Sequence, residues 1–159
     1  ISDFERISDH AKNISEAALE IYEKKISFAA EARREMQMLE SAVTEILQLA
    51  VSGFIDEDID RAHLVEPLEE RIDALCDEVK LRHAARVQNE ICSLSDGFVY
   101  NDLLTNYERV ADHCSNIAIA MIELQSNELD AHGYIINLME TRPHNFNEIY
   151  AGFCEKYKI

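Results

Sequence analysis

Residues that interrupt helices are scarce in this chain. Among its 159 residues are only four glycines and two prolines, while alanine, leucine, isoleucine, glutamate and arginine are plentiful. Glycine and proline disfavour helices most strongly, so their scarcity predicts long helices with few breaks. A chain of this length buries roughly 70% of its surface on folding, which is enough for one domain. We therefore expect an all-α protein.

Basic residues are also in short supply. Lysine and arginine number 15 against 31 aspartates and glutamates, which gives a net charge of −16. A chain with this balance repels phosphate backbones and anionic lipid headgroups. We expect its ligands to be cations and basic protein surfaces. Nucleic acid is not an expected partner, and this segment is not expected to insert directly into a membrane.

Three further features are missing. The four cysteines form no CxxC pair and no secretory signal is present, so a reduced cytoplasmic setting with free thiols is expected. No run reaches the roughly 18 consecutive apolar residues that a membrane span requires. The chain also begins at Ile1 on a charged helical pattern without an initiator methionine. This beginning suggests a fragment of a longer protein.

Apolar residues recur three and four positions apart in four segments, which predicts amphipathic helices packed side by side. The segments are residues 4–21, 29–50, 65–79 and 100–124, and residues from Asp58 onward could extend the third despite Pro67.

Polar residues and glycine predict where these helices begin and end. Ser27 is available as an N-cap of the second helix and Gly53 as its stop, while Asn89 is a plausible C-cap of the third. Ser93 or Ser95 could cap the fourth helix. The short connections predict an antiparallel up-down bundle.

Two parts of the pattern are less regular. No strong breaker lies between Lys24 and Phe28, so the first two helices could instead fuse into one long helix exchanged with a second molecule. After His132 and Gly133 the pattern weakens through residues 141–145. A short terminal helix that docks on the bundle is then predicted by Phe146, Tyr150, Phe153 and Tyr157.

One motif occurs twice. "DFERISDHAKNI" at residues 3–14 and "NYERVADHCSNI" at residues 106–117 share glutamate, arginine, aspartate, histidine, asparagine and isoleucine in register. The repeat indicates an internal duplication. Its acids, Glu5 and Asp9 in one copy and Glu108 and Asp112 in the other, lie four apart on the outward side of a helix. Each such like-charge pair destabilises a helix by about 0.2–0.5 kcal/mol, so their retention on both copies favours a shared cation.

A third acidic pair, Glu69 and Asp73, occurs on the third predicted helix, with Asp77 one turn further. If the following turn centres near residue 91, this pair comes level with Glu108 and Asp112 on the neighbouring antiparallel helix. Carboxylate oxygens in such a group attract Mg²⁺, Ca²⁺, Mn²⁺ or iron.

The histidines that follow the repeated aspartates allow two interpretations. His10 and His113 could be additional ligands, which would also admit zinc, or they could hydrogen-bond a neighbouring helix. A solvated acidic face is the alternative to a metal site.

Motifs of the common hydrolases are absent: the chain has no glycine-rich phosphate loop, no GxSxG and no HExxH. A di-iron bundle would require inward-facing ExxH motifs, whereas here the acids face outward. Two alternatives to a regulatory metal-binding protein stay open at this point. One is a metal-dependent enzyme, including a di-iron type of bundle, and the other is a structural dimerisation bundle without metal.

The decamers "ERISDHAKNI" and "ERVADHCSNI" resemble those of the PhoU family, whose three-helix repeats carry ERxxDHxxNI in the third helix and ExxxD in the second. The run from "EERIDAL" through "RHAARV" to "CSLSDGFVYNDLLTNYERVADHCSNIA", with "HGY" and the aromatic tail, is similar more specifically to the C-terminal PhoU domain of Na/Pi cotransporter II-related bacterial membrane proteins.

This resemblance implies a single PhoU-like domain and a division of the chain. Residues 1–26 would be the third helix of an incomplete first repeat, residues 27–130 a second three-helix repeat and residues 131–159 a tail. It also implies iron or zinc bound on the surface of the bundle. By matching position, the implied ligands are Glu69, Asp73, Glu108 and Asp112, with Glu5 and Asp9 as an unpaired set.

The resemblance further implies a non-enzymatic regulatory role in phosphate uptake. The domain would lie at the cytoplasmic face of the bacterial inner membrane, following the transmembrane part of a sodium-dependent phosphate transporter in the same polypeptide. A homodimer is an additional expectation.

Overall fold

The computed structural model describes residues 1–126 and 145–159, and every regular element in these segments is a helix. The elements are α1 (Ser2–Lys24), α2 (Ala30–Asp56), α3 (Ile59–Gln88), α4 (Leu94–Ser126) and α6 (Phe146–Lys156). The expected all-α bundle of four long helices and a short terminal one is confirmed. The predicted weakening after His132 and Gly133 lies outside the described residues.

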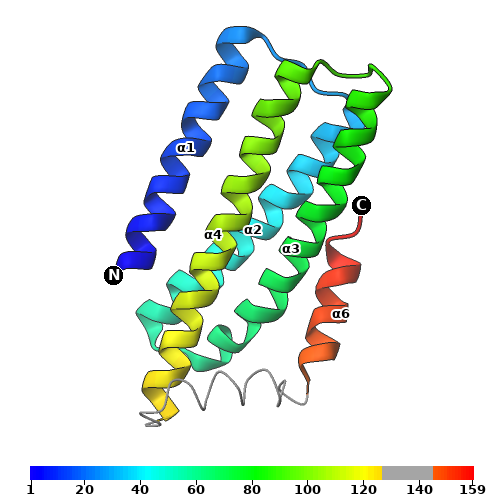
Figure 1. Cartoon of the computed structure of the whole chain (residues 1–159). Helices are drawn as coiled ribbons and strands as arrows, with labels where there is room; N and C mark the ends of the chain where they lie inside the picture. The colour runs from blue at the N-terminus through cyan, green and yellow to red at the C-terminus, as the bar shows by residue number, and fades with distance from the viewer. Residues whose placement is uncertain (127–144) are drawn as a thin grey trace.

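The four long helices run alternately up and down (Figure 1). α2, α3 and α4 pack against one another, α1 packs against α4, and α6 packs against α3. Because α4 contacts all three other long helices, it is the central element of the bundle. α1, in contrast, is held mainly by α4.

The core lies between α2, α3 and α4. Each large apolar side chain buried there contributes about 1.5–3 kcal/mol by leaving water. The largest fully buried side chains include Leu39, Ile46, Leu68, Ile72, Leu75, Tyr100 and Leu104. All four cysteines are free thiols. Burial raises the pKa of Cys76 and of Cys114 to about 12, so these two thiols stay protonated and act as small core residues.

The connection between α1 and α2 excludes the single fused helix that the sequence allowed. Lys25 adopts a left-handed conformation with φ 53°, and the N–H groups of Lys25 and Ile26 close α1 on its last carbonyls. The next helix begins only after Ala29, which has extended backbone and no side-chain cap. Ser27 is therefore not the N-cap.

The other predicted boundaries are partly right. α2 continues past Gly53 and ends at Asp56, before left-handed Glu57. The side chain of Asp58 then caps α3 by accepting a hydrogen bond from Arg61 N. Pro67 is buried within α3, so the helix accommodates one missing backbone donor.

At the next connection Asn89 is the C-cap of α3 as predicted, but it has φ −90°, and the left-handed residue is Glu90. Ser93 caps the following helix, because its Oγ accepts from Asp96 N at 3.0 Å.

The aromatic tail docks on the bundle as predicted. α6 lies along α3, where Phe146 and Tyr157 are buried. The Arg71 Nη2 donates to the backbone oxygen of Tyr157 at 2.5 Å. Glu45 of α2 accepts from Lys156 Nζ at 2.7 Å and also from the hydroxyl of Tyr157. These contacts fix the tail to two helices of the core.

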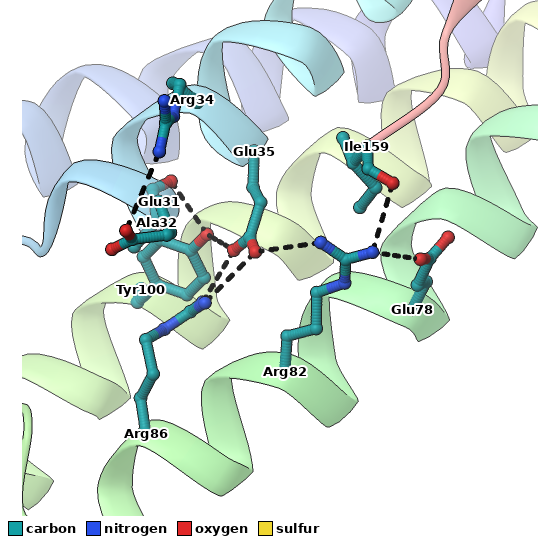
Figure 2. Close-up of polar contacts among 9 residues, drawn as sticks. All are labelled: Glu31, Ala32, Arg34, Glu35, Glu78, Arg82, Arg86, Tyr100 and Ile159. Carbon is teal, nitrogen blue, oxygen red and sulfur yellow. Dashed lines mark hydrogen bonds and ion pairs between the residues drawn. The ribbon is translucent and has the colours of Figure 1, made fainter.

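A buried carboxylate, that of Glu35, joins α2 to α3 and α4. The side chain of Glu35 is only 4% exposed. Its two oxygens accept hydrogen bonds from the two terminal nitrogens of Arg86, at 3.0 and 2.6 Å. The Tyr100 hydroxyl donates to Ala32 O at 3.0 Å and also lies 3.3 Å from Glu35, as Figure 2 shows. Arg82 approaches Glu35 at 3.7 Å and donates to the backbone oxygen of Ile159.

By length and composition alone, α2 is the one described helix that could cross a membrane. Its most apolar window has a mean hydropathy of 1.3, and 33% of that window is buried in the bundle. This is weak evidence for a span, because core helices of soluble bundles pass the same test. The buried face of α2 packs against α3 and α4.

Replacing Glu35 should destabilise the bundle strongly. Glu35→Ala leaves Arg86 buried without its partner, so the free energy of unfolding should fall by about 3–5 kcal/mol. Urea denaturation followed by circular dichroism measures the loss. The control is Glu31→Ala, which removes an exposed carboxylate one turn earlier that lies 3.6 Å from Arg34. That variant should lose less than about 0.5 kcal/mol, and equal losses in both variants would contradict the prediction.

Candidate metal centre

Three carboxylates from two helices come together on the surface of the bundle. Glu69 and Asp73 lie one turn apart on α3, and Asp112 faces them from the antiparallel α4. One oxygen from each lies within 4.8 Å of the others. Glu69 and Asp112 are half-buried, whereas Asp73 is exposed. The structure therefore brings together three of the four carboxylates nominated on these two helices.

The cluster concentrates negative charge. Burial raises the pKa of Glu69 to about 7, and the charges of Glu66, Asp73 and Asp112 add to the effect. The pKa of Asp73 is also raised, by burial first and then by Glu108 and Asp112. Near neutral pH Glu69 is therefore partly protonated. A cation bound between these oxygens would take the place of that proton.

The fourth nominated carboxylate, Glu108, has a basic partner within the protein. Lys80 Nζ lies 2.5 Å from Glu108 Oε2 and 3.9 Å from Asp77. Burial disfavours the charged form of Lys80, but the hydrogen bond and charge of Glu108 outweigh it and raise the pKa of Lys80. Glu108 is thus neutralised by an ammonium group in this structure. Asp77 is exposed beside it.

Lys80 was missed because only acids and histidines were considered as members of the site. A signal was present: Lys80 follows Asp73 by seven residues, which places the two on the same face of a helix two turns apart. A second basic side chain, Arg109, contacts Asp112 at 3.0 Å along α4.

The acids of the first repeat copy lie apart from this cluster. Glu5 and Asp9 are exposed on α1, and Arg6 lies 3.8 Å from Asp9. Within residues 1–126 and 145–159, neither acid belongs to a group of three ligand atoms. Their role as an unpaired ligand set stays a prediction.

The histidine and the asparagine of each motif copy form hydrogen bonds with the first residue of the other copy. His113 Nδ1 donates to Asp3 Oδ1 at 3.0 Å, and Asn116 donates to the same oxygen at 3.1 Å. In the other direction, His10 Nδ1 donates to Asn106 Oδ1 at 2.9 Å, joined by Asn13 at 3.1 Å. The two rings stack with centroids 5.7 Å apart.

We name this arrangement the reciprocal clasp. It gives a structural reason for the histidine and the asparagine that both motif copies contain. Asp3 and Asn106 occupy the same position in the two copies, and each is held by the histidine and asparagine of the opposite copy. Because both oxygens can only accept, both ring nitrogens that face them carry hydrogen. The clasp fastens α1 to α4. A role of His10 and His113 as additional ligands stays a prediction.

The fold is an antiparallel helical bundle. A carboxylate cluster lies between the facing helices α3 and α4, and the duplicated motif occurs once on α1 and once on α4. The chain belongs to the PhoU family, because the family model described as the PhoU domain matches residues 36–121, more than half of its length. This match covers most of α2, α3 and α4, including all three clustered carboxylates.

Curated proteins of the same kind are similar over most of the chain. The phosphate-specific transport system accessory protein PhoU homolog 1 of Thermotoga maritima is 28% identical over 127 residues. The PhoU homolog of Streptococcus pneumoniae that carries the same description is 25% identical over 128 residues. Each alignment covers 80% of this chain but 54% and 58% of the relatives, so the chain spans about half of their length. No solved structure matches.

The raised pKa of Glu69 predicts how stability depends on pH in metal-free protein. Ionising Glu69 opposes folding, and this cost grows as pH rises from the ordinary value of 4.5 to about 7. Glu69→Gln should therefore raise the free energy of unfolding at pH 8 by about 1–2 kcal/mol, with the gain fading toward pH 5. Urea denaturation with chelator present measures this difference.

The matched control is Glu5→Gln, which removes an exposed carboxylate outside the cluster. At pH 8 the free energy of unfolding of this variant should differ from that of the parent protein by less than about 0.5 kcal/mol. If Glu69→Gln behaves in the same way, charge repulsion does not govern the cluster.

The reciprocal clasp can be tested by a double-mutant cycle. Asp3→Ala and His113→Ala should show a coupling energy of about 0.5–1.5 kcal/mol in urea denaturation, because they remove the same hydrogen bond. Asp3→Ala combined with Asn13→Ala is the control, since Asn13 bonds Asn106 and not Asp3. Coupling in the control pair as large as in the test pair would contradict a specific contact.

Proposed function

We propose that this chain is a non-enzymatic regulatory domain of phosphate transport that binds a metal cation through Glu69, Asp73 and Asp112. The observation that carries the metal site is the convergence of three carboxylate oxygens within 4.8 Å, with a half-buried Glu69 whose pKa is raised to about 7. The regulatory role is supported by the relatives, whose names describe phosphate-specific transport system accessory proteins.

The donors favour particular cations. Carboxylate oxygens suit iron, manganese, magnesium and calcium and also bind zinc, whereas the imidazole of His113 is directed to Asp3 of α1. Iron or zinc is our first choice, because the family resemblance implies them. Glu108 would join the site only by giving up its contact with Lys80, so the ammonium and the metal compete for this carboxylate. Asp77 is near enough to Lys80 to take over that contact.

A finer proposal concerns what the domain is attached to. The run from Glu69 through the aromatic tail resembles domains of Na/Pi cotransporter II-related proteins, so we place this chain beside the transmembrane part of a sodium-dependent phosphate transporter. That part would belong to the same polypeptide, with the domain at the cytoplasmic face of the bacterial inner membrane. The rival is a separate accessory protein like the curated relatives. The sequence of the gene upstream of Ile1 distinguishes them, since several apolar spans support the fusion and a soluble leader opposes it.

The proposed repeat division is supported by the clasp. Residues 1–26 and residues 27–130 each contain one copy of the motif. The helices that carry the two copies form equivalent hydrogen bonds in both directions, as two copies of one repeat would. The acids of the incomplete copy, Glu5 and Asp9, would then form a second site with a helix not contained in this chain. A homodimer could supply that helix, and sedimentation velocity tests whether one forms.

Metal binding is tested by titration. Calorimetry with Mn²⁺, Zn²⁺ and anaerobic Fe²⁺ should detect binding to the parent chain, and Asp73→Asn/Asp112→Asn should weaken it by at least about tenfold, since it removes two of three ligands. At about pH 6.5, binding should release close to one proton from Glu69, measured by repeating the titration in buffers of different ionisation enthalpy.

Glu5→Gln/Asp9→Asn is the control, because it also removes two carboxylate charges but outside the cluster. It should bind like the parent chain. Absence of binding in the parent chain would refute the metal site, and equal loss in both double variants would place the metal elsewhere. Hydrolysis of phosphate esters by the metal-loaded chain would favour the enzyme alternative.

A further inference from the structure

The α3–α4 connection presents apolar side chains to solvent. Ile91, Leu94 and Phe98 are 61%, 63% and 69% exposed. Leu94 and Phe98 lie one turn apart at the start of α4, and Ile91 precedes them in the connection. We call these three residues the apolar tip. The α3–α4 connection that carries them lies at one end of the bundle (Figure 1).

The exposure does not result from a loosely held turn. Ile91 N donates to Arg86 O at 2.9 Å, and Ser93 Oγ caps the first turn of α4. Gly97 packs so closely on His83 that a Cβ there would lie 3.1 Å from the ring nitrogen Nε2. The backbone is therefore fixed by contacts that do not involve the apolar tip. Polar residues would fit equally well at its three positions, so folding does not explain their apolar character.

Unpaired basic residues lie at the same end of the bundle. The α1–α2 connection is beside the start of α4, since Ile26 packs against the cluster of Ala17, Val99 and Leu103, and the ring of Phe28 lies 5.1 Å from that of Tyr100. Lys25 and Arg33, which flank this connection, are exposed and have no ion pair among the described residues. Both connections are seen at the top of Figure 1.

The local charge of this end differs from that of the whole chain. Residues 19–35 carry four basic and four acidic side chains, and residues 78–100 carry three of each, whereas the chain has a net charge of −16. At the opposite end, residues 48–66 carry five acidic side chains and one basic. The end of the bundle with the apolar tip is therefore closer to neutral than the chain as a whole, with Glu90 and Asp96 as the acids at the α3–α4 connection itself.

We infer that the apolar tip inserts into the surface of a lipid bilayer, with Lys25 and Arg33 facing anionic headgroups. A projecting set of apolar side chains beside unpaired cations matches an interface that is apolar inside and anionic outside. In this orientation the end of the bundle with balanced charge contacts the bilayer, and the acidic faces lie away from the lipid. Asp73 and Ile91 are 18 residues apart on or just beyond α3, about 27 Å along a helix, so this inference is independent of the metal site.

Vesicle sedimentation tests the inference with the chain alone. The parent chain should sediment with vesicles of phosphatidylcholine and phosphatidylglycerol, and Leu94→Ser/Phe98→Ser should reduce the bound fraction at least fivefold. Lys25→Glu/Arg33→Glu should reduce binding to these vesicles while leaving binding to pure phosphatidylcholine within twofold. Circular dichroism checks that each variant is folded.

Ile55→Ser/Leu124→Ser is the matched control, because it removes exposed apolar side chains from the acidic end. It should bind vesicles within twofold of the parent chain. Three results would overturn the inference: no sedimentation of the parent chain, equal loss in the control, or unchanged binding of Leu94→Ser/Phe98→Ser. If sedimentation velocity shows instead that the tip variant abolishes a dimer and vesicle binding is absent, the tip contacts a second copy of this chain.

Discussion

Burial of α4 on three sides is the interaction on which the rest of the structure depends. Its apolar face closes the core with α2 and α3, while neighbouring faces meet α1 and the acidic surface of α3. Tyr100 and Leu104 are fully buried in that core, which fixes the rotation of α4 about its axis. With that rotation fixed, Asp112 must face α3 and His113 must face α1. The site and the clasp are therefore consequences of one packing arrangement.

The duplicated motif serves two purposes through two sets of residues. Its histidine and asparagine hold the opposite copy, so they have a structural use whether or not metal binds. Its glutamate and aspartate make no such contact with the opposite copy. Asp112 faces an acid pair of α3, whereas Glu5 and Asp9 face none within the described residues. The two copies share six residues in register but have unequal surroundings.

The helices and the antiparallel order could be predicted from apolar spacing, because burial of a continuous stripe decides both. The approach of Glu69 to Asp112 also followed from counting residues on either side of the turn near Glu90. Helix ends were harder: α2 runs past Gly53 and ends only at left-handed Glu57, where Asp58 N donates to Gly53 O. The spacing from Asp73 places Lys80 on the acidic face of α3. Its choice of Glu108 as partner depends in addition on how the two helices are rotated, which residue spacing within one helix does not specify.

The internal countercharge from Lys80 distinguishes this cluster from metal sites that hold a fold together. A group of four carboxylates without such a partner would force its helices apart whenever the ion left. Here the ammonium group belongs to the protein itself and neutralises Glu108, while Glu69 is partly protonated near neutral pH. Repulsion among the clustered carboxylates is thus reduced from within the chain, before any external cation is considered.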